Sequence, residues 1–336
     1  MIRFGEMNRR RFLQWGALTV GGSAILSRQA SHAQSDANPT IKIGFWPIAA
    51  GLPLYMGVEK GIFKDAGLNV EAVKFASAQQ VAEGIIAGRL QGSANGTASG
   101  ALGLAEIASP GLFKIIATNP SNVDHVLDQF LVAKDSPIQS IAELKDKKVA
   151  CGPGAQNIAI AKGILKANGI VDPNVQALDI KQHVPAIQSG QIDAVYTLEP
   201  TGTVGGLAGI TRILEAGVVA KYILGDPKAP WSGGSATLTN EFLKQYPEVS
   251  KTYIAAYRQS IEEIRKDPDA ARPFLEGYTA ITGDLTKTVP LPAYLIYDEF
   301  TDRDKQYFQK FFDFMTSEGI FSKNVPIEPL LYQEAG

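Results

Sequence analysis

The stretch IKIGFWPIAAGLPLYMGVEKGIFKDAGLNVEAVKF, residues 41–75, decides the fold. Its first part alternates apolar side chains at Ile41, Ile43 and Phe45, which is the period of a half-buried strand. PLYMGVEKGIF then has the pattern of a short helix, and LNVEAVKF (68–75) that of a second strand. Strand, helix and strand in this order predict parallel strands joined by a right-handed crossover.

The alternation of helices and strands continues beyond this stretch. AQQVAEGIIAG and SGALGLAEIA have helical spacing, while LQGSA and FKIIAT (113–118) are predicted strands. The pattern then starts again with a predicted strand in DQFLVAK (128–134). SIAELKDKKVACG predicts a helix that leads into a strand, and further strands are predicted in VQALDI and DAVYTL (193–198). The sequence therefore predicts a second α/β unit.

The C-terminal part begins with the strand SATLTN, which follows the Pro/Gly loop KAPWSGG (228–234). PEVSKTYIAAYRQSIEEIRK places apolar side chains on one helical face, at Val249, Tyr253, Tyr257, Ile261 and Ile264. DKQYFQKFFDFMTSEGI predicts an aromatic-rich helix that packs on the outside of a sheet.

Length and charge narrow the classes of function. The 336 residues are 45% hydrophobic and 20% charged, which is enough material for about two domains. Residues 1–33 carry five Arg and one Glu, so the remainder has 27 basic and 33 acidic residues. The excess of acidic residues argues against binding to nucleic acid, which requires a positively charged surface.

The N-terminal segment, residues 1–33, has the pattern of a removable export signal. The basic NRRRFLQ precedes the apolar WGALTVGGSAIL, which is too short to span about 30 Å of hydrocarbon, and SHA supplies a small-x-small cleavage site. Arg9 and Arg10, followed by Phe12 and Leu13, resemble a twin-arginine signal. We expect cleavage near Ala33 and a periplasmic protein.

Cysteine and histidine are scarce in the mature chain. Cys151 stands alone, so no disulfide and no structural zinc site is expected, and burial as a small apolar group is its usual meaning. His125 and His183 have no acidic or cysteine neighbour in a metal-ligand pattern, which favours structural roles. The sequence thus predicts no metal and no cofactor.

The segment VACGPGAQNIAIAKGIL, residues 149–165, is a strand, a Gly-Pro-Gly turn and a helix. A helix that opens on glycines presents free backbone N–H groups to an anion. No Lys-Ser/Thr pair follows the turn, and Asn157 stands where a dinucleotide site needs its third glycine. These departures argue against a nucleotide.

Three segments together resemble the periplasmic solute-binding proteins of the nitrate, sulfonate and taurine class. They are IGFWPIAAGLPLYMGVEKGIFKDAGLNVEAVKF, SIAELKDKKVACGPGAQN and HVPAIQSGQIDAVYTLEP, and the resemblance covers nearly all of residues 41–280. It implies a two-lobed periplasmic-binding-protein fold (type II), in which each lobe is a mainly parallel sheet flanked by helices. We expect residues 41–122 and 235–336 in lobe one and residues 123–234 in lobe two.

A ligand in such a fold is expected between the lobes, because open parallel sheets bind ligands beyond the carboxyl ends of their strands. Those ends hold the candidate ligand-binding residues Trp46, Pro47, Gly51, Gly96, Thr97, Ser99, Asn119, Gly154, Ala155, Gln156, Asn157, Glu199 and Trp231.

Two opposed helix N-termini, one with Thr97 and Ser99 and one with Gln156 and Asn157, suit an oxyanion without any arginine. Ser and Thr at helix starts are also ordinary caps, and only the family resemblance favours the binding role. Glu199 either braces the hinge or faces an ammonium group. Trp46 and Trp231 either pack on an organic ligand or close a core. Taken with Glu199, they favour an organic, amine-bearing or alkyl anion over nitrate or bicarbonate.

The resemblance implies a monomeric, non-enzymatic component of an ABC importer. Its closed form would deliver a small anionic or zwitterionic solute, such as a sulfonate, taurine or a carboxylate, to a membrane permease. A separate ATPase would supply the energy, and the twin-arginine machinery would export the protein.

Two alternatives stay open at this stage. A ligand sensor would present its closed form to a receptor kinase. Pyrimidine-synthesising fungal relatives share the fold, but their resemblance would require a cysteine-rich cluster and a histidine cofactor site, and neither is visible. A Cys151 and His183 pair is the remaining route to nucleophilic chemistry.

Overall fold

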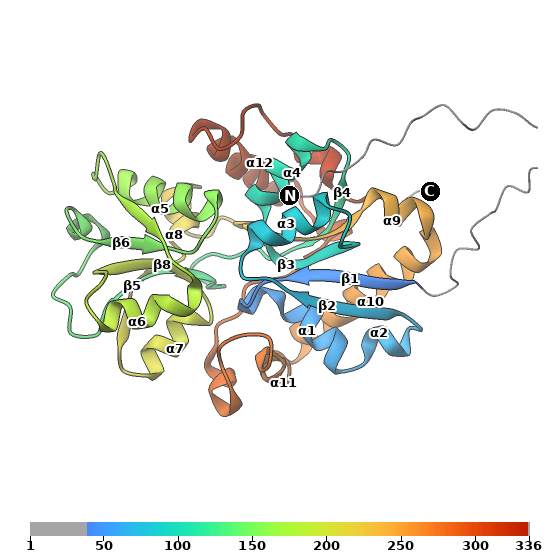
Figure 1. Ribbon diagram of the computed structural model, residues 1–336, viewed down its shortest axis with the longest axis horizontal. Coiled ribbons are helices and arrows are strands. Elements are labelled where there is room, and N and C mark those ends of the chain that lie inside the picture. The colour runs from blue at the N-terminus through green and yellow to red at the C-terminus, as the bar shows by residue number, and fades with distance from the viewer. Residues whose placement is uncertain (1–38, 335–336) are drawn as a thin grey trace, which may run out of the picture. The chain divides into compact units, whose positions relative to one another are not determined.

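The first sheet collects strands from both ends of the chain. In the computed structural model, which describes residues 39–334, its order is β11-β4-β10-β3-β1-β2 (Figure 1). The strands are β1 (Thr40–Phe45), β2 (Asn69–Lys74), β3 (Gly92–Ala98), β4 (Phe113–Thr118), β10 (Gly234–Thr239) and β11 (Leu295–Ile296). The part of the molecule around this sheet is called the first lobe below.

The second sheet comes from the middle of the chain, in the order β7-β6-β8-β5-β9. Its strands are β5 (Asp128–Ala133), β6 (Val149–Cys151), β7 (Val175–Ala177), β8 (Ala194–Leu198) and β9 (Thr211–Ala216). The part of the molecule around it is called the second lobe.

Most strands of each sheet run in one direction, as predicted, but three of the five strand pairs in the first sheet and two of the four in the second are antiparallel. β1 pairs in parallel with β2 and β3, whereas β10 is antiparallel to both β3 and β4 and separates them. In the second sheet β6 pairs in parallel with β7 and β8, and β5 is antiparallel to β8 and β9. The mixed α/β architecture with two sheets flanked by helices confirms the predicted fold class.

The helices have the following bounds: α1 (Leu52–Glu59), α2 (Ile62–Asp65), α3 (Ala78–Ile86), α4 (Ser99–Ala108), α5 (Ala155–Ala167), α6 (His183–Gln188), α7 (Thr201–Leu207), α8 (Val218–Tyr222), α9 (Asn240–Gln245), α10 (Pro247–Lys266), α11 (Pro268–Ala271) and α12 (Asp302–Ser317). α4 and α10 match the predicted spans. The helix expected before β6 is only a 3₁₀ turn at Ile141–Leu144, because Asp146 adopts a left-handed φ of 62° soon after it.

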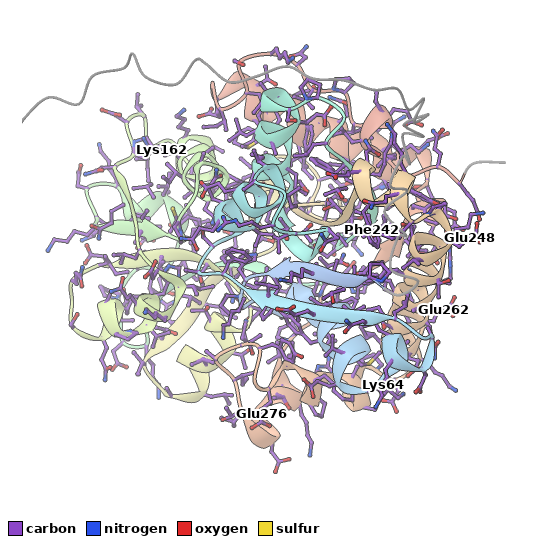
Figure 2. The ribbon with its side chains drawn as sticks, turned by 45° about the vertical axis from the view of Figure 1, so that its right-hand side comes forward. Lys64, Lys162, Phe242, Glu248, Glu262 and Glu276 are labelled. Carbon is purple, nitrogen blue, oxygen red and sulfur yellow. The ribbon has the colours of Figure 1, made fainter. Side chains whose placement is uncertain are left out.

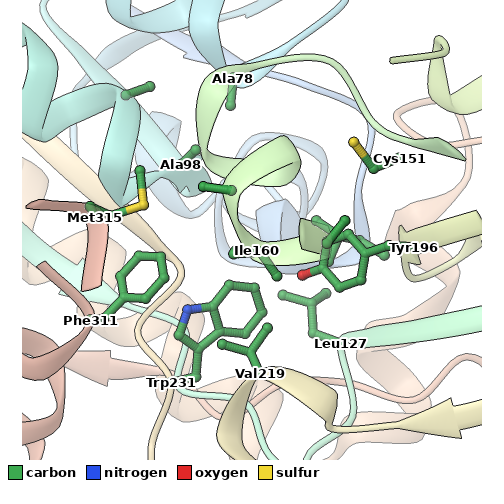
Figure 3. Close-up of a cluster of buried hydrophobic side chains, with 14 of the residues drawn as sticks. Ala78, Ala98, Leu127, Cys151, Ile160, Tyr196, Val219, Trp231, Phe311 and Met315 are labelled. Carbon is green, nitrogen blue, oxygen red and sulfur yellow. The ribbon is translucent and has the colours of Figure 1, made fainter. Parts of the chain in front are cut away.

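Buried apolar side chains from both sheets and from α12 form one cluster (Figure 3). Trp231 lies at its centre with an exposure of 1%, and its ring makes an edge-to-face contact with Phe311 of α12 at a centroid distance of 5.9 Å. Figure 2 shows charged side chains on the outside of the first lobe, and those of Lys64, Glu248, Glu262 and Glu276 are exposed.

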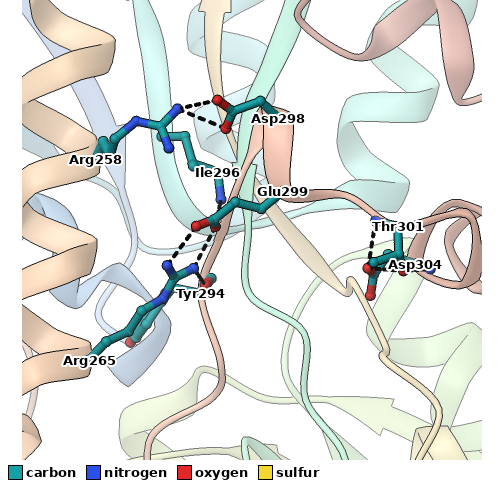
Figure 4. Close-up of polar contacts among 8 residues, drawn as sticks. All are labelled: Arg258, Arg265, Tyr294, Ile296, Asp298, Glu299, Thr301 and Asp304. Carbon is teal, nitrogen blue, oxygen red and sulfur yellow. Dashed lines mark hydrogen bonds and ion pairs between the residues drawn. The ribbon is translucent and has the colours of Figure 1, made fainter.

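The segment after β11 is fastened to α10 by two arginines (Figure 4). Arg258 bonds both carboxylate oxygens of Asp298 at 2.7 Å, and Arg265 bonds those of Glu299 at 2.8 and 2.6 Å. The hydroxyl of Tyr294, just before β11, donates to the carbonyl of Ala49 at 3.2 Å. The residue before β11 therefore supports the loop that follows β1.

None of the helices within residues 39–334 is both long and apolar enough to cross a bilayer. The expected export signal at residues 1–33 and its cleavage site near Ala33 lie outside the described residues.

Candidate functional site

The two lobes meet where strands end. The loop after β1 contacts the end of β8, because the backbone nitrogen of Ala49 donates to the carbonyl of Glu199 at 2.9 Å. The N-termini of α4 and α5 also meet, through the side chain of Gln156. Of the predicted site residues, Gln156 and Glu199 thus take part directly in the contact between the lobes.

Gln156 makes the most direct connection. Its amide oxygen accepts from the backbone nitrogen of Gly100 at 2.6 Å, and its amide nitrogen donates to the carbonyl of Gly233 at 2.9 Å. The N-terminus of α4, where we expected a ligand oxyanion, therefore holds a protein carboxamide in this structure. Asn157 instead donates to Pro153 in its own turn at 3.0 Å.

The turn before α5 takes its shape from Gly154. This residue has φ 106° and ψ 149°, a conformation that residues with a side chain avoid, and Ala155 begins the helix immediately after it. A Cβ on Gly154 would meet only the Cβ of Gln79 of α3, at 3.9 Å. Helix α5 thus begins at this turn, next to α3 of the first lobe.

The end of β3 is a tight polar junction built on Gly96. Its nitrogen donates to Oδ1 of Asn119 at 2.9 Å, and its carbonyl accepts from Nε1 of Trp46 at 2.7 Å. Gly96 has a φ of 86° and packs against Gly234, where a Cβ would lie 2.5 Å from the Cα of Gly96. The Trp46 ring is therefore fixed by a backbone carbonyl and buried, with an exposure of 3%.

Ser99 starts α4 but does not cap it with its hydroxyl. The hydroxyl lies 3.0 Å from the carbonyl of Ser232, to which it donates, and 3.0 Å from the hydroxyl of Ser235. Ser99 thus joins the first lobe to the chain segment that returns from the second.

Four buried polar atoms near these strand ends have no hydrogen-bond partner among the described residues. They are Oγ1 of Thr97, Nδ2 of Asn119, Oγ of Ser121 and Nε1 of Trp231. Ser121 and Trp231 exchange backbone hydrogen bonds at 3.1 Å, which brings the ends of two chain segments together. Buried polar groups normally have partners, so these atoms are candidates for ligand contacts.

Glu199 is fully buried and its carboxylate is held on both oxygens. Oε1 accepts from Nε2 of Gln129 at 2.7 Å, and Oε2 accepts from the backbone nitrogen of Thr203 at 3.1 Å. Burial raises the pKa of Glu199, although both hydrogen bonds oppose the rise. These bonds favour the bracing role over an exposed contact for an ammonium group.

An open, mostly apolar chamber of about 760 Å³ lies between the lobes beside this contact. Pro47 and Pro200 border it, directly after Trp46 and Glu199. We call it the outer chamber; its other lining residues are Lys74, Phe75, Ala76, Asp179, Ile180, Lys181, Val184, Pro185, Thr201, Val204, Ala208, Ile210, Thr279 and Ala280.

Pro47, one of the predicted ligand-binding residues, borders this chamber, and sequence reasoning did not single out the other lining residues. The segment from Lys74 to Ala76 follows a strand of the parallel sheet, so the same strand-end rule could have found it. The residues of α6 and α7 carry no such local signal. Gly51, expected at the site, is buried beneath the hydroxyl of Tyr55 instead, 2.2 Å from where its Cβ would stand.

The Cys151 and His183 pair does not have the features of a nucleophile and base. Burial raises the pKa of Cys151 to about 12, and its thiol donates to the carbonyl of Gly152 at 3.3 Å. Burial lowers the pKa of His183 to about 4, and its ring nitrogens bond the hydroxyl of Thr197 at 2.8 Å and the carbonyl of Leu178 at 3.0 Å. Residues 39–334 also contain no cluster of His, Cys, Asp and Glu suited to a metal ion.

Comparison with known proteins adds a family and a fold. The family model described as NMT1/THI5 like matches residues 50–271. No curated protein sequence matches the chain.

Several solved structures have the same fold. The alkanesulfonate-binding protein SsuA from Xanthomonas axonopodis pv. citri, bound to MOPS, aligns with a TM-score of 0.71 at 16% identity, over 88% of this chain and 99% of its own. A Candida albicans protein with the generic periplasmic binding protein fold aligns with a TM-score of 0.65 at 14% identity, over 89% and 99%. The nitrate-binding protein NrtA from Synechocystis PCC 6803 gives 0.60 at 13%, over 85% and 83%.

Proposed function

The chain belongs to the NMT1/THI5-like family, and from this premise we propose that it is the solute-binding component of an ABC importer. It binds a small organic anion, either a sulfonate, a taurine-like zwitterion or a carboxylate, between its two lobes. It then delivers this ligand to a membrane permease that a separate ATPase drives. The protein acts as a monomer in the periplasm, after export by the twin-arginine machinery and removal of residues 1–33.

The observation that carries the proposal is the group of unpartnered buried polar atoms where the strand ends of the two lobes meet. Thr97, Asn119, Ser121 and Trp231 offer two hydroxyls and two N–H donors, on residues in or next to β3, β4 and β10. Similar folds include proteins that bind an alkanesulfonate and nitrate, which supports an anion as the ligand.

Binding is expected to act through lobe closure. Residues 41–122 and 235–336 form one lobe in this proposal and residues 123–234 the other, so the chain crosses between them twice. A ligand that touches both lobes favours the closed form through its higher affinity for that form. The contacts of Glu199 and Gln156 keep the two lobes aligned, and the ligand forms hydrogen bonds with the buried polar atoms that have no partner.

A thermal-melt screen tests the proposal. The purified protein is heated with alkanesulfonates, taurine, nitrate, bicarbonate, aromatic acids and pyrimidines. A ligand at a hundred times its Kd adds about 2.7 kcal/mol of stability, which raises the Tm by a few degrees. An organic anion that raises the Tm supports the proposal. A shift only with nitrate, bicarbonate or pyrimidines, or with none of the compounds, contradicts it.

Two threonine variants locate the site. Thr97→Val keeps the side-chain shape but removes the unpartnered hydroxyl, so we expect it to shrink the ligand-induced shift. Thr237→Val is the matched control, because the Thr237 hydroxyl is 2.9 Å from that of Ser93 and has a partner within the same sheet. Equal ligand shifts in the two variants would place the ligand elsewhere.

A further inference from the structure

The outer chamber has mostly apolar walls, unlike the polar strand ends described above. Its first-lobe wall includes Phe75 and Ala280, and its second-lobe wall includes Ile180, Val204 and Ile210. These side chains are carbon surfaces that face an opening of about 760 Å³. Such a volume lies within the range of pockets that hold drug-sized ligands, about 300 to 1,000 Å³.

This size and lining constrain the ligand. Nitrate or taurine would leave most of the chamber filled with water against apolar walls. An apolar group that displaces this water gains the free energy of burying carbon surface on both sides. The chamber therefore fits a ligand with a bulky apolar body.

The charges around the chamber constrain the ligand further. Lys74 ends β2 in the first lobe, and Lys181 belongs to the 3₁₀ turn Ile180–Gln182 in the second. Neither lysine takes part in an ion pair within residues 39–334, and both side chains are exposed. Asp179, the acidic residue of the lining, leaves the chamber with a net positive charge.

We infer that the ligand is an organic acid with a bulky aromatic or branched body, which fills the outer chamber while its anionic group lies between Lys74 and Lys181. This inference rests on the proposed function but places the ligand in the outer chamber, whose lining includes none of Thr97, Asn119, Ser121 and Trp231. The lysine variants below and Thr97→Val therefore distinguish the two places. The two lysines belong to different lobes, so an anion between them is attracted by both lobes only when they are closed. The same contact thus provides specificity and favours closure.

The inference makes a small inorganic anion and a zwitterion poor ligands. Nitrate has no apolar body, and the ammonium group of taurine would have to lose its hydration beside two lysines. Asp179 is the one carboxylate of the lining that such an ammonium group can approach.

Calorimetric titration of the full protein with matched probes tests the inference. The probes are 4-phenylbutyrate, butyrate, 4-phenylbutylamine, taurine and nitrate. We expect 4-phenylbutyrate to bind at least about tenfold more tightly than butyrate, which lacks the ring, and we expect no binding of the amine. Tighter binding of taurine than of 4-phenylbutyrate overturns the inference but leaves the proposed function standing, whereas tighter binding of nitrate than of the organic probes overturns both. If none of the five probes binds, the inference fails, and the alkanesulfonates of the thermal-melt screen decide whether the proposed function stands.

Three lysine variants assign the contacts. Lys74→Met and Lys181→Met keep the length of the side chain without its charge, and each is expected to weaken 4-phenylbutyrate binding about tenfold. Lys64→Met is the control, because Lys64 is exposed on α2 and does not line the chamber. Equal affinities in all three variants would show that the lysines do not hold the acid, and would overturn the inference.

Discussion

The side-chain oxygen of Gln156 in the second lobe lies 2.6 Å from the backbone nitrogen of Gly100 in the first. The same side chain donates to the carbonyl of Gly233 at 2.9 Å, where the chain re-enters the first sheet. A single carboxamide therefore satisfies one donor at the start of α4 and one acceptor just before β10. The Gln156 side chain thus occupies the hydrogen-bonding position at the start of α4 that we expected a bound ligand to occupy.

Gln156→Ala is expected to open the protein in the absence of ligand. Each lost hydrogen bond weakens the closed form by about 0.5–1.5 kcal/mol, so two bonds shift the balance between closed and open forms by roughly 5- to 150-fold. Small-angle X-ray scattering measures this as a larger radius of gyration. Asn157→Ala is the control, because Asn157 bonds only Pro153 in its own turn through its side chain. A radius that is the same in both variants would contradict the role of Gln156.

Local patterns were sufficient for the elements with clear periodicity. α10 begins and ends as predicted, and Tyr253, Tyr257, Ile261 and Ile264 on its predicted apolar face are buried. α4 likewise spans its predicted residues. These elements depend on side chains three or four positions apart, which the sequence displays directly.

Pairing between distant segments could not be predicted in the same way. β10 lies between β3 and β4, and β9 and β11 were not predicted at all. β11 has only two residues, Leu295 and Ile296, so it has no period to detect, and its place depends on β4.

The candidate site shows the same limit. Sequence reasoning placed Gln156 correctly at the start of α5, but it did not predict that the side chain reaches Gly100, 56 positions away. It also left two roles open for Trp231, whose ring is buried against Phe311 of α12. Partners that lie far apart in the chain decide these roles, and no local pattern encodes them.

Asp128 is expected to make stability fall as the pH rises. Its carboxylate is buried and accepts from the backbone nitrogen of Val219 at 2.9 Å, and burial raises its pKa from 3.8 to about 6. The folded protein holds this proton more tightly than the unfolded chain. Stability from this group is thus present below pH 4 and is lost as the pH rises to about 6, by roughly 3 kcal/mol in all.

Asp128→Asn isolates this effect, because asparagine keeps an acceptor for Val219 but cannot ionise. The free energy of unfolding of the variant, relative to that of the parent, should rise by roughly 3 kcal/mol between pH 4 and pH 7.5. Urea denaturation at several pH values measures the difference. A difference that does not change with pH would show that Asp128 does not titrate in this range.

His183 is expected to act in the opposite direction. Burial lowers its pKa from 6.5 to about 4, so the unfolded chain takes up a proton that the folded protein refuses. Stability is therefore lost as the pH falls from about 6.5 to 4, by roughly 3 kcal/mol. His183→Gln removes this loss, and its stability relative to the parent should rise as the pH falls.

The two groups titrate over overlapping ranges with opposite signs, so their effects nearly cancel in the parent protein. The double variant, Asp128→Asn with His183→Gln, should give a pH dependence close to that of the parent, while the single variants deviate in opposite directions. Denaturation curves for all four proteins at the same pH values test this. Deviations of the same sign in the two single variants would contradict the assignment.

Gly154→Ala is expected to destabilise the protein through its backbone alone. At φ 106° and ψ 149° an alanine is strained, which costs about 1–3 kcal/mol, whereas its Cβ would meet no atom closer than 3.9 Å. Gly206→Ala in α7 is the control, because a Cβ there would point into open space and its φ is not positive. The control should be neutral or gain up to about 1 kcal/mol, since alanine favours a helix over glycine. The midpoints of urea denaturation compare the two variants. Equal midpoints would mean that the turn before α5 relaxes to accept a side chain, and the orientation of α5 would then not depend on a glycine at position 154.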